Sequence, residues 1–174
     1  MELEARSEAG WQQNLAKCLS GATPIHLVGV GNPIGRDDSV GLHVISALRH
    51  RLGARPRPNV RIHQPALDPE RTLANLGGKM ESVVIFDAVE CNRDPGHIFC
   101  AKLSDSRFGF FATHNVPLKL IPGFEASLAD AWIVGVQPDD TGVGEDMTEI
   151  VRHSAELLVE SVEKLLEGGR RGPA

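Results

Sequence analysis

The chain has 174 residues, of which 41% are hydrophobic and 5% aromatic, and this size fits one domain with one core. A formal net charge of -5 disfavours a nucleic-acid surface, which needs clustered Lys and Arg to displace phosphate counterions. No apolar run approaches the roughly 20 residues that span a bilayer, and the first residues are acidic and polar, unlike a signal peptide. We therefore expect a cytoplasmic protein that binds neither membranes nor nucleic acid.

The three cysteines are Cys18, Cys91 and Cys100, an odd number without CxxC spacing. This pattern argues against a disulfide framework and against a cysteine metal knuckle. We expect reduced, partly buried thiols that behave as small hydrophobic side chains.

The first half of the chain alternates short apolar runs with helical patterns. Residues 1–24 are expected to form a peripheral extension, including a loose amphipathic helix that uses Trp11, Leu15 and Leu19. The elements predicted next are a strand at 25–30, a glycine loop, a helix over 38–52, a strand at 60–63, a short helix at 69–76 and a strand at 82–86.

The second half begins with a turn at 92–96 and continues with strands and helices. Strands are expected at 97–103 and 132–136, with a short helix at 116–120 between them. The last helix has an apolar stripe at i, i+3, i+4 and i+7 spacing, formed by Met147, Ile150, Val151, Ser154, Leu157, Leu158, Val162, Leu165 and Leu166. Gly168 and Gly169 end this helix, and residues 168–174 are expected to be a flexible tail.

Alternating strands and helices predict an α/β fold with three layers, in which a twisted sheet of about five strands has helices on both faces. The sheet should be mostly parallel, or mixed if the turn at 92–96 makes the third and fourth strands pair antiparallel. Residues 25–167 are expected to form the single domain. In such sheets ligands bind beyond the carboxyl ends of the strands.

The loop Gly29–Gly35 invites comparison with a dinucleotide-binding loop. The third glycine of GxGxxG should be residue 34, which is Ile34, and no GK[ST] follows. Asp37 and Asp38 at the helix start would repel a pyrophosphate. We therefore reject nucleotide binding here.

Three polar side chains are predicted at the strand ends. Aspartate is a preferred N-cap and complements the helix dipole, and one of Asp37 and Asp38 is enough for that role. If Asp37 is the cap, Asp38 lies in the first turn and can point over the strand ends. Asp87 follows the apolar run SVVIF, where a carboxylate needs either a cation or backbone N–H donors. His114 lies in a loop, where a histidine is often merely solvated.

Together these three residues become more informative. The first and third strands are expected neighbours, so Asp38 and Asp87 can face each other across one crevice, with His114 as a third group. Two carboxylates and an imidazole suit Zn²⁺, Ni²⁺ or a related divalent ion. The other six histidines lack companions at metal-ligand spacing and are interpreted as structural or surface residues.

Four segments then reveal a resemblance. In order and spacing, over about residues 25–166, they closely resemble the nickel-iron hydrogenase maturation endopeptidases. The last two look most like the branch that processes formate-hydrogenlyase-type hydrogenases. The segments are Gly31–Gly41, Phe86–Ala88, Thr113–Leu118 and Gly135–Asp139, the last followed by Met147 and Thr148.

Two positions depart from the family pattern. Ser39 stands where the family usually has glycine, and the segment 63–70, HQPALDPE, lacks the glycine-rich turn common in the wider family. Neither departure removes an expected ligand. The second leaves open the shape of one loop that faces the substrate.

The resemblance implies that Asp38, Asp87 and His114 are the catalytic and nickel-contacting residues. It implies one cut that removes a C-terminal extension from the large-subunit precursor of a nickel-iron hydrogenase after nickel insertion. The nickel would arrive in the substrate, and zinc or another divalent ion could replace it. All three residues are expected on loops, so replacing them should abolish processing without unfolding the protein.

Two mechanisms and two other functions remain open at this point. The ion could be a checkpoint and anchor for the precursor, or it could polarise the carbonyl or activate water, with a carboxylate as general base. A nickel-binding or hydrogenase-docking assembly chaperone would need the same ligands without cleavage. A small-molecule hydrolase would need metal but no hydrogenase precursor.

Overall fold

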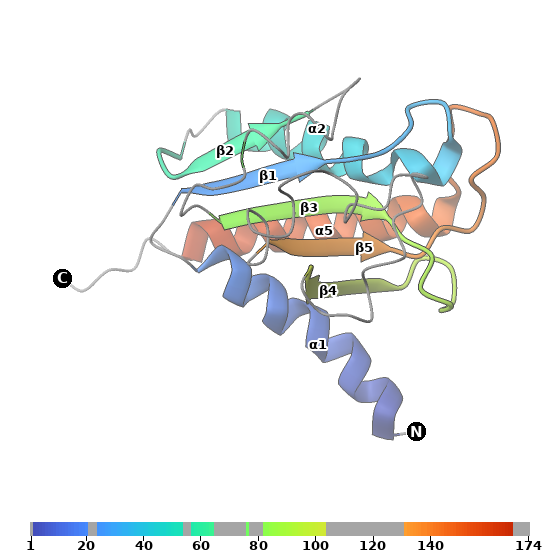
Figure 1. The fold of residues 1–174 in the computed structure, drawn as a ribbon, viewed down its shortest axis with the longest axis horizontal. Helices are drawn as coiled ribbons and strands as arrows, with labels where there is room; N and C mark the ends of the chain where they lie inside the picture. Colours follow the sequence, from blue (N-terminus) through green and yellow to red (C-terminus); the bar gives the residue numbers. More distant parts are fainter. Residues whose placement is uncertain are drawn as a thin grey trace.

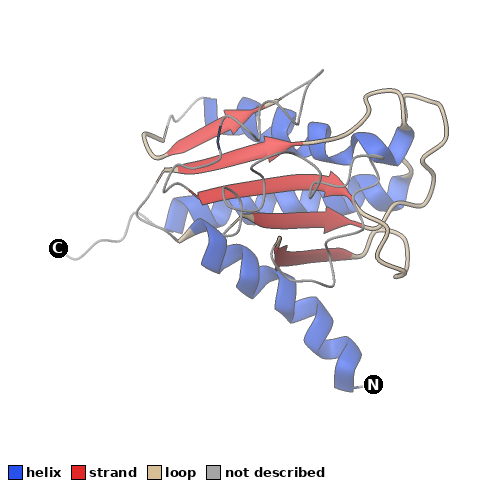
Figure 2. Cartoon of the chain, in the orientation of Figure 1, coloured by secondary structure: helices blue, strands red, loops and turns tan. Residues whose placement is uncertain are grey.

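The computed structural model describes residues 2–20, 24–53, 57–64, 76, 82–103 and 131–168, with side chains from Gly10 onward (Figures 1 and 2). The predicted helices at 69–76 and 116–120, the flexible tail beyond Gly168 and His114 lie outside these ranges, apart from Leu76. Within the described part of the chain, no helix is long and apolar enough to cross a membrane.

The centre of the fold is a five-stranded sheet in the order β2-β1-β3-β5-β4. The five predicted strands are confirmed, and their bounds are Ile25–Gly29 for β1, Val60–His63 for β2, Ser82–Ala88 for β3, Ile98–Lys102 for β4 and Trp132–Val136 for β5. Strand β1 pairs parallel with β2 and β3, and β3 pairs parallel with β5.

The sheet is mixed, but the antiparallel partner differs from the predicted one. Strand β4 pairs antiparallel with β5, with Ile98 opposite Val136, and not with β3. The connection from Val89 to His97 is too long for a tight hairpin, which has two to five residues. It instead carries the chain past the position that β5 occupies.

Three long helices pack against one face of the sheet. They are α1 (Glu2–Leu19), α2 (Val40–Gly53) and α5 (Glu149–Gly168), and a short 3-10 helix, η1 (Arg36–Ser39), precedes α2. Figure 1 shows α2 and α5 behind the strands. These helices share one large apolar cluster with the strand residues that face them. The opposite face carries a smaller cluster that includes Val28, Ile85 and Leu76.

The N-terminal helix predicted from Trp11, Leu15 and Leu19 is present, and all three side chains are buried. They belong to the same apolar cluster as α2 and α5, so this helix is part of the main core and not loosely attached. The Asn14 amide donates a hydrogen bond to the backbone carbonyl of Cys100 at 2.8 Å, which ties α1 to β4.

The apolar stripe of α5 is largely buried, as predicted, and the helix ends at Gly168. Ile150 and Leu157 are exceptions, with exposed fractions of 50% and 40%. These residues lie at the edges of the stripe, where the helix surface turns away from the sheet. Cys18, Cys91 and Cys100 are free thiols, and Cys18 and Cys100 are buried, as predicted.

Candidate functional site

Two glycines bring the start of α2 close to the carboxyl ends of β1 and β3. A Cβ atom on Gly41 would lie 2.1 Å from the Phe86 carbonyl oxygen and 2.2 Å from the Val30 carbonyl oxygen. A Cβ on Gly29 would lie 2.5 Å from the Gly41 carbonyl oxygen. These glycines therefore allow close packing between helix and sheet, as glycines do in other strand-to-helix loops. Nucleotide binding is not needed to explain them.

The turn before α2 is tight and holds Asp38 by its own backbone. The Asp38 N–H donates to the Gly35 carbonyl at 2.9 Å, and the Asn32 N–H donates to the Asp38 carbonyl at 3.1 Å. A Cβ on Gly35 would lie 2.9 Å from the Asp38 Cβ, and one on Gly31 would lie 2.3 Å from the Asp38 carbonyl oxygen. Only glycine fits at these two positions, because a side chain would displace Asp38.

Arg36 adopts a left-handed backbone conformation, with φ of 49°, which is unfavourable for a non-glycine residue. Several contacts compensate for it. Its N–H donates to the Gly144 carbonyl at 3.0 Å, its guanidinium pairs with the Asp140 carboxylate at 2.8 Å, and its carbonyl accepts from the Ser39 hydroxyl at 2.6 Å. The turn is thus joined to the segment that follows β5.

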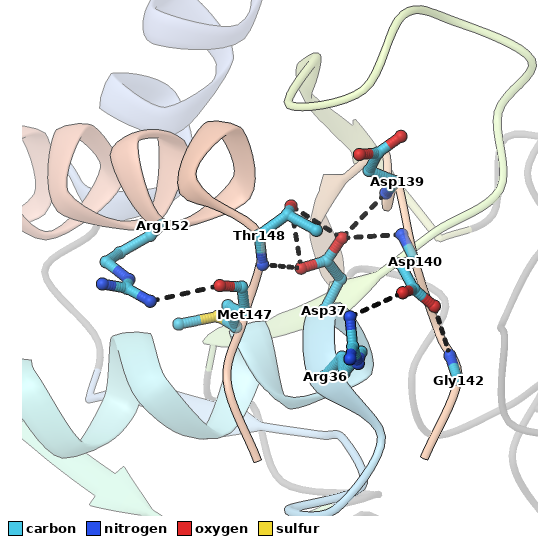
Figure 3. Close-up of polar contacts among 8 residues, drawn as sticks. All are labelled: Arg36, Asp37, Asp139, Asp140, Gly142, Met147, Thr148 and Arg152. Carbon is cyan, nitrogen blue, oxygen red and sulfur yellow. Dashed lines mark hydrogen bonds and ion pairs between the residues drawn. The ribbon is translucent and has the colours of Figure 1, made fainter. Parts of the chain in front are cut away.

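Asp37 is fully buried, and its carboxylate binds the segment after β5. One oxygen accepts hydrogen bonds from the Asp139 and Asp140 N–H groups, both at 2.9 Å, and the other accepts from the Thr148 N–H at 2.7 Å. The Thr148 hydroxyl lies 3.0 and 2.9 Å from the two oxygens (Figure 3). The predicted capping role is therefore wrong: the 3-10 helix has no side-chain cap, and Asp37 joins two loops.

Asp87 lies within β3 and opposite Gly135 of β5, because the strand continues to Ala88. It is buried, so the expectation that it lies on a loop is wrong. One carboxylate oxygen accepts the Ala88 N–H at 2.9 Å. Burial raises the pKa of the Asp87 carboxyl well above its usual range, and the negative charge of Asp38 raises it further, while the Ala88 hydrogen bond opposes the rise.

The structure therefore places Asp38 near enough to Asp87 for its negative charge to raise the pKa of the Asp87 carboxyl. This proximity was predicted from the order of the strands. Asp38 is half-buried on η1, which packs against β3, and Asp87 is buried at the carboxyl end of that strand. His114, the third predicted residue, lies outside the described ranges. In those ranges no group of three His, Cys, Asp or Glu side chains is arranged to hold a metal ion. A divalent cation beside the pair would be chemically favourable because it would offset both burial and repulsion.

Known proteins share both this sequence pattern and this fold. No family model matches the chain. The hydrogenase 3 maturation protease of Escherichia coli is 26% identical over 140 residues, which cover 79% of this chain and 87% of that protein. A crystal structure of the NiFe hydrogenase maturation protease HycI from Thermococcus kodakarensis is 26% identical, with a TM-score of 0.68, over 88% of this chain and 98% of that one. In sequence and in fold, the chain is therefore similar to hydrogenase maturation proteases.

A further solved structure supports the same fold. The solution structure of the endopeptidase HycI from Escherichia coli has a TM-score of 0.64 and 23% identity, and the match covers 82% of this chain and 90% of that one. The protein is accordingly a peptidase, and the resemblance to the formate-hydrogenlyase branch agrees with the hydrogenase 3 relative. The five-stranded mixed sheet of this chain matches the fold of the Thermococcus kodakarensis HycI structure.

Beside this site, Gln137 is an organising residue that the sequence pattern did not single out. Its buried side chain accepts the Cys91 N–H at 2.8 Å and donates to the Glu90 carboxylate at 2.8 Å. Its backbone N–H donates to the His97 carbonyl at 2.9 Å. Gln137 therefore holds the segment that leaves β3 just after Asp87. A polar residue directly after the apolar run WIVGV was the available signal.

Two of the remaining histidines are partners. The buried His26 on β1 and His63 on β2 are joined through Nδ1 and Nε2 at 2.9 Å, and their rings stack with centroids 5.0 Å apart. Their interpretation as structural residues fits this pairing across neighbouring strands. The two histidines meet because β1 pairs with β2, and their spacing along the sequence does not predict this contact.

Proposed function

We propose that this peptidase removes a C-terminal extension from the large-subunit precursor of a nickel-iron hydrogenase after nickel has been inserted. Asp38, Asp87 and His114 contact that nickel in the precursor. The observation that carries the proposal is the pair of carboxylates at the carboxyl edge of β1 and β3, where Asp87 is buried beside the negative charge of Asp38. The relatives named as hydrogenase maturation proteases support the same assignment.

The electrostatics of the pair offer a way to distinguish precursors. In the free protein the Asp87 carboxylate is disfavoured by burial and by Asp38, as its raised pKa indicates. A precursor that brings a divalent cation to this position relieves the repulsion, whereas a precursor without nickel leaves it in place. Selection then follows from the difference in binding free energy between the two precursors.

The proposed roles follow from these positions. Asp38 lies on a turn held by its own backbone hydrogen bonds, so its carboxylate needs little reorganisation to contact the ion. Burial and the charge of Asp38 raise the pKa of Asp87, which makes its carboxylate a stronger proton acceptor and suits it to act as general base for the attacking water. Nickel is part of the substrate here, and zinc or another divalent ion is expected to replace it.

A cleavage assay tests the proposal. The purified protein is incubated with a nickel-loaded large-subunit precursor and with the same precursor without nickel, and the size of the precursor is followed. We expect a size shift only with nickel. Cleavage of neither precursor would favour the non-cleaving assembly chaperone, and metal-dependent hydrolysis of small esters or amides alone would favour a small-molecule hydrolase.

Variants test the three residues. Asp38→Asn, Asp87→Asn and His114→Ala are each expected to abolish cleavage. Asp139→Asn is the matched control, since this exposed carboxylate lies at the same edge and points away from Asp37 (Figure 3). Wild-type cleavage by any one of the three variants would remove that residue from the site.

A further inference from the structure

Asp37 accepts hydrogen bonds from the segment after β5 through both of its carboxylate oxygens. It is fully buried, and both of its oxygens act only as acceptors, towards backbone N–H groups of Asp139, Asp140 and Thr148 and towards the Thr148 hydroxyl. Figure 3 shows the carboxylate between Thr148 on one side and Asp139 and Asp140 on the other. Charge-assisted hydrogen bonds of this kind are stronger than neutral ones and fix geometry as well as distance.

The segment after β5 is otherwise irregular, and further contacts join it to the turn of Asp38. The Gly144 N–H donates to the Ile34 carbonyl at 2.9 Å, and Gly35 and Gly144 form an isolated parallel bridge. The Asp37 N–H donates to the Asp140 carbonyl at 3.1 Å. Asp37 is thus bound through both its backbone and its side chain, and the residue that follows it is Asp38.

The hydrogen bonds of Asp38 within its own turn do not set where that turn lies relative to Asp87. They join the Asp38 backbone to Gly35 and Asn32, which belong to the same turn. The position of the turn over the sheet depends on contacts with other segments, and Asp37 makes buried contacts of this kind. A small displacement of a substrate-contacting group costs far more in catalysis than in stability.

We propose that Asp37 is a positioning residue, which holds the Asp38 carboxylate towards Asp87 by binding the segment that follows β5, with the Thr148 hydroxyl as its side-chain partner. This inference rests on the proposed function, because the property that Asp37 controls is the recognition of nickel in the precursor. It assigns no direct contact between Asp37 and the substrate.

Thr148 offers the sharper test, since Asp37→Asn would turn an amide N–H₂ towards buried donors and could unfold the protein. Thr148→Val keeps the shape and the backbone N–H but removes the hydroxyl, and Thr148→Ser restores it. Binding of nickel-loaded and nickel-free precursor is measured by titration at a temperature where circular dichroism confirms that each variant is folded. The readout is the ratio of the two affinities, which a smaller folded fraction does not change.

We expect Thr148→Val to lower this ratio by about tenfold, the effect of losing one charge-assisted hydrogen bond, and Thr148→Ser to keep it within about twofold of the wild type. A wild-type ratio well above one with an unchanged ratio in Thr148→Val would overturn the positioning role and leave the proposed function standing. A wild-type ratio of one would overturn the proposed function, and the role of Asp37 in nickel recognition with it.

Discussion

Replacing Gly41 with alanine tests whether the close approach of α2 to the sheet positions the site. The added Cβ would lie 2.1 Å from the Phe86 carbonyl oxygen and 2.2 Å from that of Val30. Real Cβ contacts are essentially never shorter than 3.0 Å, and both neighbours are backbone atoms that cannot rotate away. The start of α2 must therefore move outward by about 1 Å, carrying Asp38 with it.

The expected cost follows from this displacement. Overpacking a core costs about 1–3 kcal/mol, and we expect the upper end because the clash is with two carbonyl groups of the sheet. A domain with a stability of about 5–15 kcal/mol would remain folded. Cleavage by the folded protein should nevertheless fall by about 100-fold, because a shift of 1 Å at a substrate-contacting group has effects of that size.

Urea unfolding and precursor cleavage below the unfolding transition measure the two effects. Gly53→Ala is the matched control, since Gly53 belongs to the same helix and its added Cβ would meet nothing within 4 Å. It should be neutral or stabilise the protein by up to about 1 kcal/mol. If Gly41→Ala unfolds within about 0.5 kcal/mol of the wild type, the steric argument is refuted.

Three further predictions concern electrostatics, the core and the surface. The pKa of Asp87 is raised in the folded protein, so the protonated carboxyl stabilises the fold below the unfolded pKa and this stabilisation is lost as pH rises through the folded pKa. Asparagine resembles the protonated carboxyl at every pH. Asp87→Asn should therefore melt higher than the wild type at pH 7.5, and the two melting temperatures should converge near pH 4. Leu15→Ala should lower the free energy of unfolding, measured in urea, by about 2–5 kcal/mol, because the Leu15 side chain of α1 is fully buried in the core. Replacing both Ile34 and Val143 with serine should raise the KM for precursor cleavage without changing the melting temperature, since these side chains are 55% and 89% exposed on the loops around Asp38.

Each of these predictions has its own control. Equal melting temperatures of Asp87→Asn and wild type at pH 7.5 would contradict the burial argument. Leu157→Ala, at an exposed position of α5, should change stability by less than about 0.5 kcal/mol, and a loss as large as that of Leu15→Ala would contradict the assignment of the core. Leu157→Ser is the control for the surface pair, and an unchanged KM in the double variant would show that Ile34 and Val143 do not contribute to precursor binding.

The elements of the fold could be read from the sequence because their signals are local. The five strands follow from short apolar runs ended by turn residues, and α5 follows from its stripe of apolar residues. The pairing of β4 could not be read in this way. The turn at 92–96 indicates a reversal of the chain, which predicts that β4 lies beside β3. Instead β5, which follows β4 in the sequence, pairs with β3, and β4 pairs with the other edge of β5.

The candidate site was predictable to a similar extent. Asp38 follows β1 and Asp87 lies near the carboxyl end of β3, and these two strands pair in parallel, so the expected strand order predicts the proximity of the two carboxylates. The prediction for His114 stays a prediction. Asp37 was interpreted from its local sequence as a cap, and this was wrong because its partner Thr148 lies 111 residues away.

The sequence by itself therefore determined which strands form and which carboxylates lie near the carboxyl ends of β1 and β3, since hydrophobic periodicity depends on neighbouring residues. Tertiary structure decided what each carboxylate does. Asp37 and Asp38 are adjacent, chemically identical side chains, yet one is buried among backbone donors of a distant segment and the other is left beside Asp87. The difference arises because the fate of a buried charge depends on the donors that the folded chain brings to it.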